Sequence, residues 1–117
     1  MKRIVFLGDA LDQVRSFPEG ARKEAGGQLH KVQVQQGLEP SDWKPMGTVG
    51  SGVREIRIRE DGGAFRVLYV AQFAETVVVL HAFEKKAQKT PGRDLDLADD
   101  RLRAFTTINI NTKEKKR

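Results

Sequence analysis

The run REIRIRE at residues 54–60 limits the possible folds of this chain more than any other stretch. Apolar and charged side chains alternate along it. Ile56 and Ile58 therefore point to one side, whereas Glu55, Arg57 and Arg59 point to the other. A period of two residues is typical of a β-strand with one apolar and one solvent-facing side. The run predicts a strand whose outer side is basic.

The chain turns back after this strand. Residues 61–63 are Asp-Gly-Gly, which accept the positive φ angles that a tight hairpin connection requires. Two apolar runs follow, AFRVLYVAQF at 64–73 and TVVVLHAF at 76–83. Strands that are apolar on both sides are typical of the inner positions of a sheet. We expect a three-stranded meander.

Arg66 interrupts the first of these apolar runs. A buried guanidinium is costly unless it reaches a partner or a solvent-filled cleft. One interpretation is a structural ion pair with Glu55 or Glu60 of the neighbouring strand. The other is a functional role, because Arg57 lies one strand away and other cations follow the meander.

These cations predict a binding surface. Arg57 and Arg59 precede the hairpin, and Lys85 and Lys86 follow the third strand, so several positive charges can converge on one rim. Such a rim suits a phosphate backbone. A purely solvated cluster of charges is the simpler alternative.

The N-terminal third predicts a strand and two helices. Residues 2–7 form the strand, and Asp9 is placed to cap a short helix, with Asp12 as the acid of a capping box. Pro18 ends that helix and begins the next. The buried positions expected for the second helix are Ala21, Ala25, Leu29 and Val32.

Residues 37–52 contain four glycines and two prolines and show no periodicity, which predicts a long loop. Trp43 either anchors this loop on the core or, beside Lys44, stacks on a nucleic-acid base, and anchoring is the better supported alternative. Asp94 is placed to cap a last helix. The apolar stripe expected for that helix is Leu95, Ala98, Leu102 and Phe105.

The 117 residues predict a single domain over 1–111, followed by a basic, disordered segment at 112–117. The last six residues hold four positive charges and one negative charge, and so account for most of the net charge of +5. The nucleic-acid argument must therefore depend on local clustering. The chain has no cysteine and only two, well-separated histidines, so neither a metal site nor another cofactor is expected. With no apolar stretch of membrane-spanning length, a cytoplasmic location is predicted.

Three segments resemble the RelE/HigB superfamily of toxin ribonucleases, and in particular its phage-derived branch: GVREIRI (52–58), FRVLY (65–69) and LHAFEKKAQKTP (80–91). The resemblance extends over nearly the whole chain up to Phe105. It implies a metal-independent endoribonuclease that cleaves messenger RNA on the translating ribosome and inhibits translation. It also implies a cognate antitoxin partner, plausibly a helix-turn-helix protein.

The resemblance assigns phosphate binding to Arg66 and the basic position after the last strand to Lys85 or Lys86, with Arg57 as a basic residue of the preceding strand. Some relatives carry a catalytic tyrosine after the last strand, where this chain has none between Ala87 and Pro91. Others use histidines at positions that are not histidine here.

Metal-free RNA cleavage requires an aligned 2′-hydroxyl, charge stabilisation at phosphorus and proton transfer. Glu55 and Tyr69 are the candidates for proton transfer, although Glu55 is also the expected partner of Arg66 and Tyr69 is better explained as a core residue. His81 is expected to be a neutral core histidine or to support Lys85. Further RNA contacts are assigned to Arg59, Lys89 and Lys44.

The combined prediction is an α+β domain of RelE-like fold. It has a mostly antiparallel four-stranded sheet, two N-terminal helices on one side and a C-terminal helix near the other. The predicted function is a toxin-type endoribonuclease. The alternatives are a toxin of the same fold that acts on DNA gyrase, and a non-catalytic module that binds RNA or the antitoxin.

Overall fold

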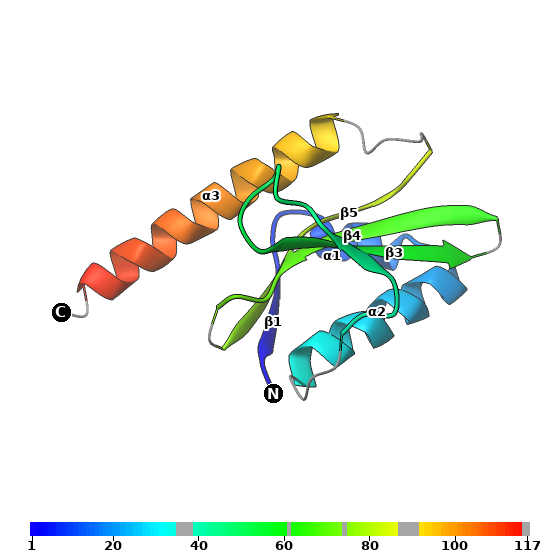
Figure 1. Cartoon of the computed structure of the whole chain (residues 1–117), viewed down its shortest axis with the longest axis horizontal. Helices are drawn as coiled ribbons and strands as arrows, with labels where there is room; N and C mark the ends of the chain where they lie inside the picture. Colours follow the sequence, from blue (N-terminus) through cyan, green and yellow to red (C-terminus); the bar gives the residue numbers. More distant parts are fainter. Residues whose placement is uncertain (35–38, 61, 74, 87–91, 116–117) are drawn as a thin grey trace.

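The computed structural model describes residues 1–34, 39–60, 62–73, 75–86 and 92–115. Within these residues the elements are, in order, β1 (Arg3–Phe6), α1 (Ala10–Arg15), α2 (Glu19–Val34), β2 (Trp43–Pro45), β3 (Val53–Glu60), β4 (Gly63–Val70), β5 (Thr76–Glu84) and α3 (Gly92–Lys115). The described strands form one five-stranded sheet in the order β1-β5-β4-β3-β2 (Figure 1). The β1 strand runs parallel to β5, and the other neighbours are antiparallel.

The α+β fold class and the meander of β3, β4 and β5 are confirmed, but the predicted number of strands is wrong. The additional strand, β2, lies inside the segment predicted to be a long loop. It places Trp43 opposite Ile56 and Lys44 opposite Glu55. A strand of three residues that ends in proline is too short to show a period of two, which explains why the sequence pattern did not reveal it.

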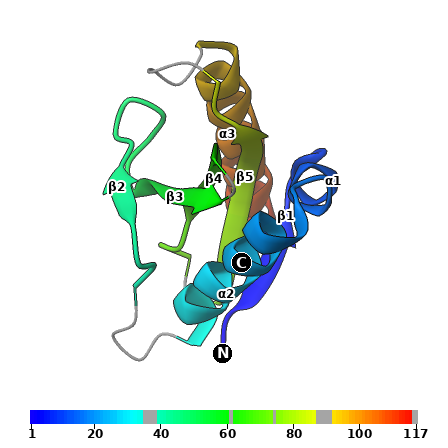
Figure 2. The same ribbon diagram turned by 90° about the vertical axis from the view of Figure 1, so that its right-hand side faces the viewer.

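The sheet separates two layers of helices (Figure 2). On one side, α1 and α2 pack against a core that includes Ile56, Val67 and Tyr69. On the other side, α3 packs against a second core built around Leu68 and Leu80. The arrangement of two N-terminal helices opposite a C-terminal helix agrees with the prediction.

The predicted apolar stripes are confirmed. Pro18 lies between α1 and α2, and the stripe expected for α2 is buried. In α3, Ala98 is buried, and the other three members of the predicted stripe pack on the second core. The α3 helix continues past this stripe to Lys115 and extends beyond the sheet (Figure 1). No helix in the described ranges has the length and apolar character needed to cross a membrane.

The N-cap position predicted for Asp9 is confirmed, whereas the cap predicted for Asp94 is wrong. Asp9 stands at the N-cap of α1, but its side chain makes no capping hydrogen bond. Its carboxylate instead accepts hydrogen bonds from Gln13 and from Arg101 of α3. Asp94 does not precede the last helix, because α3 begins at Gly92 and Asp94 lies in its first turn. Both carboxylates are therefore available for contacts between elements.

Gly26 and Gly27 provide a stability test. Both lie inside α2, and a Cβ atom added at either one would meet no atom within 4 Å. Because alanine restricts the unfolded chain and favours helix, Gly26→Ala and Gly27→Ala should each raise the free energy of unfolding by roughly 0.5–1 kcal/mol. Denaturant unfolding measures the change.

The matched control is Gly62→Ala at the hairpin. This position is equally open, but its φ of 77° is one that residues with a Cβ rarely adopt. The control should lower stability by about 1 kcal/mol. Equal effects at Gly62 and at the two helical glycines would contradict this explanation.

Candidate nucleic-acid interface

The register of the sheet brings four cations to the side on which α3 packs. Arg57 lies directly opposite Arg66, and Lys44 lies opposite Glu55 on that same side. The backbone N–H of Lys85 donates to the Ala64 carbonyl at 2.7 Å, which places Lys85 one pleat beyond Arg66. We refer to Lys44, Arg57, Arg66 and Lys85 as the cation face. It shares Arg57, Arg66 and Lys85 with the rim expected from the sequence, and it includes Lys44 in place of Arg59 and Lys86.

Arg66 is held by Glu55 at the centre of the cation face. Its Nε lies 3.5 Å from Glu55 Oε1, and the two side chains are 7% and 0% exposed. Its NH1 group donates to the Phe65 carbonyl at 3.0 Å. The predicted pair with Glu55 is therefore present. The alternative partner, Glu60, points to the other side of the sheet, where it contacts the position of Gly20 in α2.

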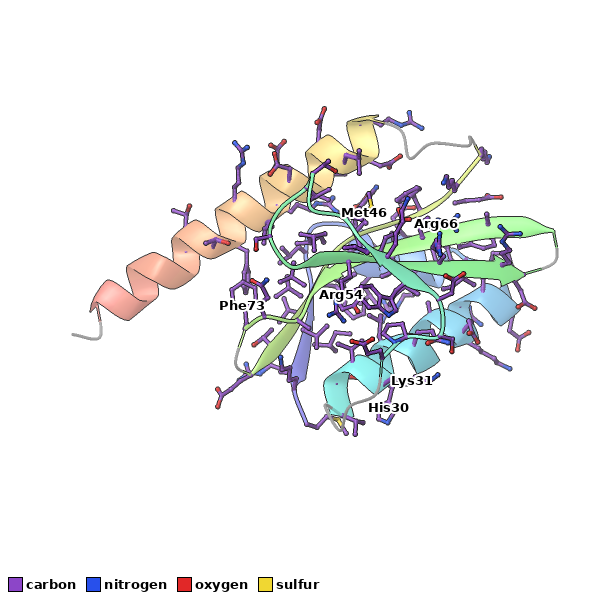
Figure 3. All side chains as sticks on the ribbon, viewed as in Figure 1. His30, Lys31, Met46, Arg54, Arg66 and Phe73 are labelled. Carbon is purple, nitrogen blue, oxygen red and sulfur yellow. The ribbon has the colours of Figure 1, made fainter. Side chains whose placement is uncertain are left out.

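The guanidinium of Arg66 is not fully used by the protein. Its buried Nε has no hydrogen-bond acceptor in the part of the chain that the structure describes, since 3.5 Å to Glu55 is an ion-pair distance only. Figure 3 shows the Arg66 side chain over the part of the sheet formed by β3 and β4. A buried donor without an acceptor is uncommon, and it makes the Arg66 guanidinium a candidate for contact with a ligand.

Burial lowers the pKa of both central cations, Arg66 and Lys85, but the consequence differs between them. Burial lowers the pKa of Arg66, the negative charge of Glu55 raises it, and Arg57 and Arg59 lower it again. Burial also lowers the pKa of Lys85, and the positive charge of Arg66 adds to that effect. Arginine stays protonated under such shifts, whereas lysine becomes able to transfer its proton more readily.

The other predicted contact residues are arranged around this centre. Arg57 pairs with Asp42 at 2.7 Å, and Lys44 Nζ lies 4.0 Å from Glu55 Oε1. Arg59 is exposed two positions after Arg57 on the same strand, and Lys86 is exposed directly after Lys85 in the chain. Lys89 lies outside the described residues, so its predicted role stays a prediction.

Glu55 and Tyr69 are not placed to exchange protons with a substrate. The Glu55 side chain is fully buried, so its described role is to hold Arg66. Tyr69 is also fully buried and belongs to the core under α1 and α2, on the side of the sheet opposite Arg66. Burial raises the pKa of Tyr69, and the positive charge of Arg54 lowers it. Tyr69 is therefore corrected from a catalytic candidate to a core residue.

Trp43 lies on the Tyr69 side as well. Its ring stands 4.0 Å from the Arg54 guanidinium, and Arg54 in turn pairs with Glu39 at 3.2 Å. The indole is half-buried at the edge of the sheet. This position agrees with an anchoring role and separates Trp43 from the cation face.

A polar network of four residues joins α3 to the sheet: Asp9, His81, Asp94 and Arg101. Of these, the sequence placed only His81 close to the candidate site. His81 Nε2 lies 2.6 Å from Asp94 Oδ1. Arg101 donates to the Leu80 carbonyl at 2.9 Å and to Asp9 at 2.6 Å, and its NH1 lies 3.5 Å from His81 Nδ1. Because arginine only donates, this geometry favours the His81 tautomer with its proton on Nε2, directed at Asp94.

A β-bulge makes this network possible. The pairing of β4 with β5 passes from His81 to Val79 and skips Leu80, so Leu80 has no partner residue in this ladder. Its carbonyl is directed to Arg101 instead. His81 also stacks on Phe83 at 5.4 Å between ring centroids, and Phe83 lies opposite Arg66. The network therefore borders the cation face.

Comparison with known proteins identifies a family whose sequence model includes this region. A sequence model of the Gp49-like phage-derived proteins matches residues 12–103, which run from the first helix through the meander and into α3. No curated protein matches the chain. The match includes all members of the cation face and extends over most of the 117 residues. The chain therefore belongs to the Gp49-like family of phage-derived proteins.

Proposed function

We propose that this chain is the toxin of a type II toxin–antitoxin pair and acts as a RelE/HigB-type endoribonuclease on ribosome-bound messenger RNA. The Gp49-like family is toxin-like and compatible with such systems, which implies a cognate antitoxin. The observation that carries the proposal is the convergence of Arg57, Arg66 and Lys85 around the buried carboxylate of Glu55.

The arrangement suits attack by a ribose 2′-hydroxyl on its own 3′-phosphate. The 2′-oxygen forms a bond to phosphorus, the 5′-oxygen of the next nucleotide leaves, and a cyclic phosphate and a 5′-hydroxyl result. Arg66 would bind the non-bridging oxygens, whose negative charge increases in the transition state. Glu55 would keep the Arg66 guanidinium in place.

Lys85 is the described residue best placed for proton transfer. Its pKa is lowered, first by burial and then by Arg66, so its ammonium group gives up a proton more readily to the leaving 5′-oxygen. Lys86 is more exposed than Lys85, and we assign it the role of a supporting charge. The structure thus favours Lys85 where the sequence left the choice open.

One observation favours a second candidate function. Glu55 is buried beneath the cation face, and Tyr69 lies across the sheet, so neither expected proton acceptor is exposed to a substrate on that face. A chain with these features can bind RNA without cleaving it. RNA binding in the absence of any cleavage would identify this non-catalytic module.

The double change Lys85→Ala with Lys86→Ala tests the proposal. It should lower cleavage of ribosome-bound messenger RNA by about 100-fold or more, the range found when one transition-state donor is lost. Stability should change by less than about 0.5 kcal/mol, because Lys86 is exposed and Lys85 is only partly buried. Cleavage rates and thermal unfolding are the measurements.

A matched double change serves as the control. Arg22→Ala with Lys23→Ala removes the same two charges from adjacent exposed positions on α2, across the sheet from the cation face. It should leave cleavage within about twofold of the unmodified chain, as distant surface charges are screened. Equal losses in the two doubles would show that only net charge matters.

A further inference from the structure

The ion pair between Asp42 and Arg57 has a geometry that a phosphate can replace. Asp42 Oδ1 accepts two hydrogen bonds from Arg57, from Nε at 3.0 Å and from NH2 at 2.7 Å. A non-bridging phosphate oxygen accepts the same pair of donors. The backbone holds Asp42 in position, because the Arg57 N–H donates to the Asp42 carbonyl at 2.9 Å.

The ion pair between Asp42 and Arg57 is accessible to ligands, and it is weak enough for a phosphate to displace Asp42. The side chains of Arg57 and Asp42 are 38% and 53% exposed, so solvent and ligands reach both. Exposed ion pairs contribute roughly 0.2–1 kcal/mol. An RNA phosphate brings a competing charge-assisted contact, together with the release of its counterions.

The position of Arg57 explains why an acidic residue, Asp42, lies beside it. Arg57 and Arg66 lie directly opposite each other on adjacent strands, an arrangement in which like charges repel. Asp42 partly offsets this repulsion, since its negative charge acts on Arg66 as well as on Arg57. In the free protein the Asp42 carboxylate takes the place of an anion bound to Arg57.

We propose that Arg57 forms a second phosphate subsite beside Arg66, and that Asp42 occupies this subsite until the RNA backbone displaces it. Asp42 thereby lowers the affinity of the cation face for RNA, because its carboxylate competes with phosphate for Arg57. The inference rests on the proposed function, because it takes RNA as the ligand of the cation face.

The chain contains a matched pair on the other side of the same strands. Glu39 and Arg54 are 3.2 Å apart, and their side chains are 52% and 36% exposed. Arg54 lies over the Trp43 ring, away from Arg66. Glu39→Gln and Asp42→Asn therefore remove the same charge at nearly the same exposure, and only Asp42→Asn frees a member of the cation face.

Fluorescence anisotropy with a short single-stranded RNA tests the inference on the full chain. Asp42→Asn should bind about two- to fivefold more tightly than the unmodified chain, the change that an exposed pair of this kind implies. Glu39→Gln should stay within about 1.5-fold. The gain should also shrink at high salt, because the competing charges are exposed.

Repeating the measurement in the Arg57→Ala chain shows whether the gain in RNA affinity acts through Arg57. In the Arg57→Ala chain, Asp42→Asn should produce no gain, since the subsite is already lost. Weaker binding by Asp42→Asn, or equal gains from Asp42→Asn and Glu39→Gln, would overturn the inference. Thermal unfolding confirms that each variant is folded.

Arg66→Ala separates this inference from the function it depends on. If Arg66→Ala weakens RNA binding and Asp42→Asn does not strengthen it, the subsite is wrong and the RNA-binding function stands. If Asp42→Asn strengthens binding but the unmodified chain never cleaves RNA, the subsite stands and the ribonuclease assignment fails. No RNA binding by the unmodified chain at low salt would overturn both.

Discussion

Replacing Arg66 with alanine should lower the free energy of unfolding by about 3 kcal/mol and abolish RNA cleavage. The loss of stability follows because the Glu55 carboxylate, fully buried beside Arg66, would lose the nearest cation of the cation face. Breaking one side of a buried pair typically costs roughly 3–5 kcal/mol, and Lys44 at 4.0 Å keeps this case at the lower end. Denaturant unfolding and a cleavage assay measure the two effects.

Two further variants separate the structural role of Arg66 from its functional role. Arg66→Met combined with Glu55→Gln removes both charges, so it should recover at least half of the lost stability and remain inactive. Arg66→Lys keeps the charge but loses the planar fork that binds two phosphate oxygens, so it should fold and fail to cleave. If the Arg66→Ala chain is less stable but still cleaves RNA, the role of Arg66 is purely structural.

Replacing Asp94 with alanine should lower the free energy of unfolding by roughly 2 kcal/mol. Asp94 accepts the Nε2–H of His81 at 2.6 Å, and the two side chains are 13% and 6% exposed. Without Asp94 the imidazole donor would stay buried with no acceptor in this network, which costs about 1–3 kcal/mol. Thermal and denaturant unfolding provide the measurement.

The same helix supplies the control. Asp99 pairs with Arg103 at 3.1 Å, where Arg103 is 77% exposed. Asp99→Ala should cost less than about 0.5 kcal/mol, as surface pairs within a helix do. Similar losses for Asp94→Ala and Asp99→Ala would mean that the contact with His81 does not fix α3 to the sheet.

Sequence patterns predicted the features of the fold that depend on residues close together in the chain. The alternation in 54–60 fixed which side chains share a side of β3, and Pro18 separated the first two helices. The same period of two also places Tyr69 on the side opposite Arg66, because the two residues are three positions apart. The alternation was therefore sufficient to exclude Tyr69 from the site.

Other features depend on contacts that no local pattern contains. The bulge at Leu80 changes the alternation of β5 and turns a carbonyl toward Arg101. Asp9 and Arg101 are separated by 92 residues, so nothing near either one indicates their ion pair. The same holds for Asp42, which meets Arg57 only because β2 forms at the edge of the sheet.

The most direct test of the central claim is the cleavage of messenger RNA in the presence of ribosomes, with the new RNA ends identified chemically. The unmodified chain should produce cyclic phosphate and 5′-hydroxyl ends, and the folded variant Arg66→Lys should produce neither. Cleavage by Arg66→Lys at the rate of the unmodified chain would contradict the claim that Arg66 binds the reacting phosphate.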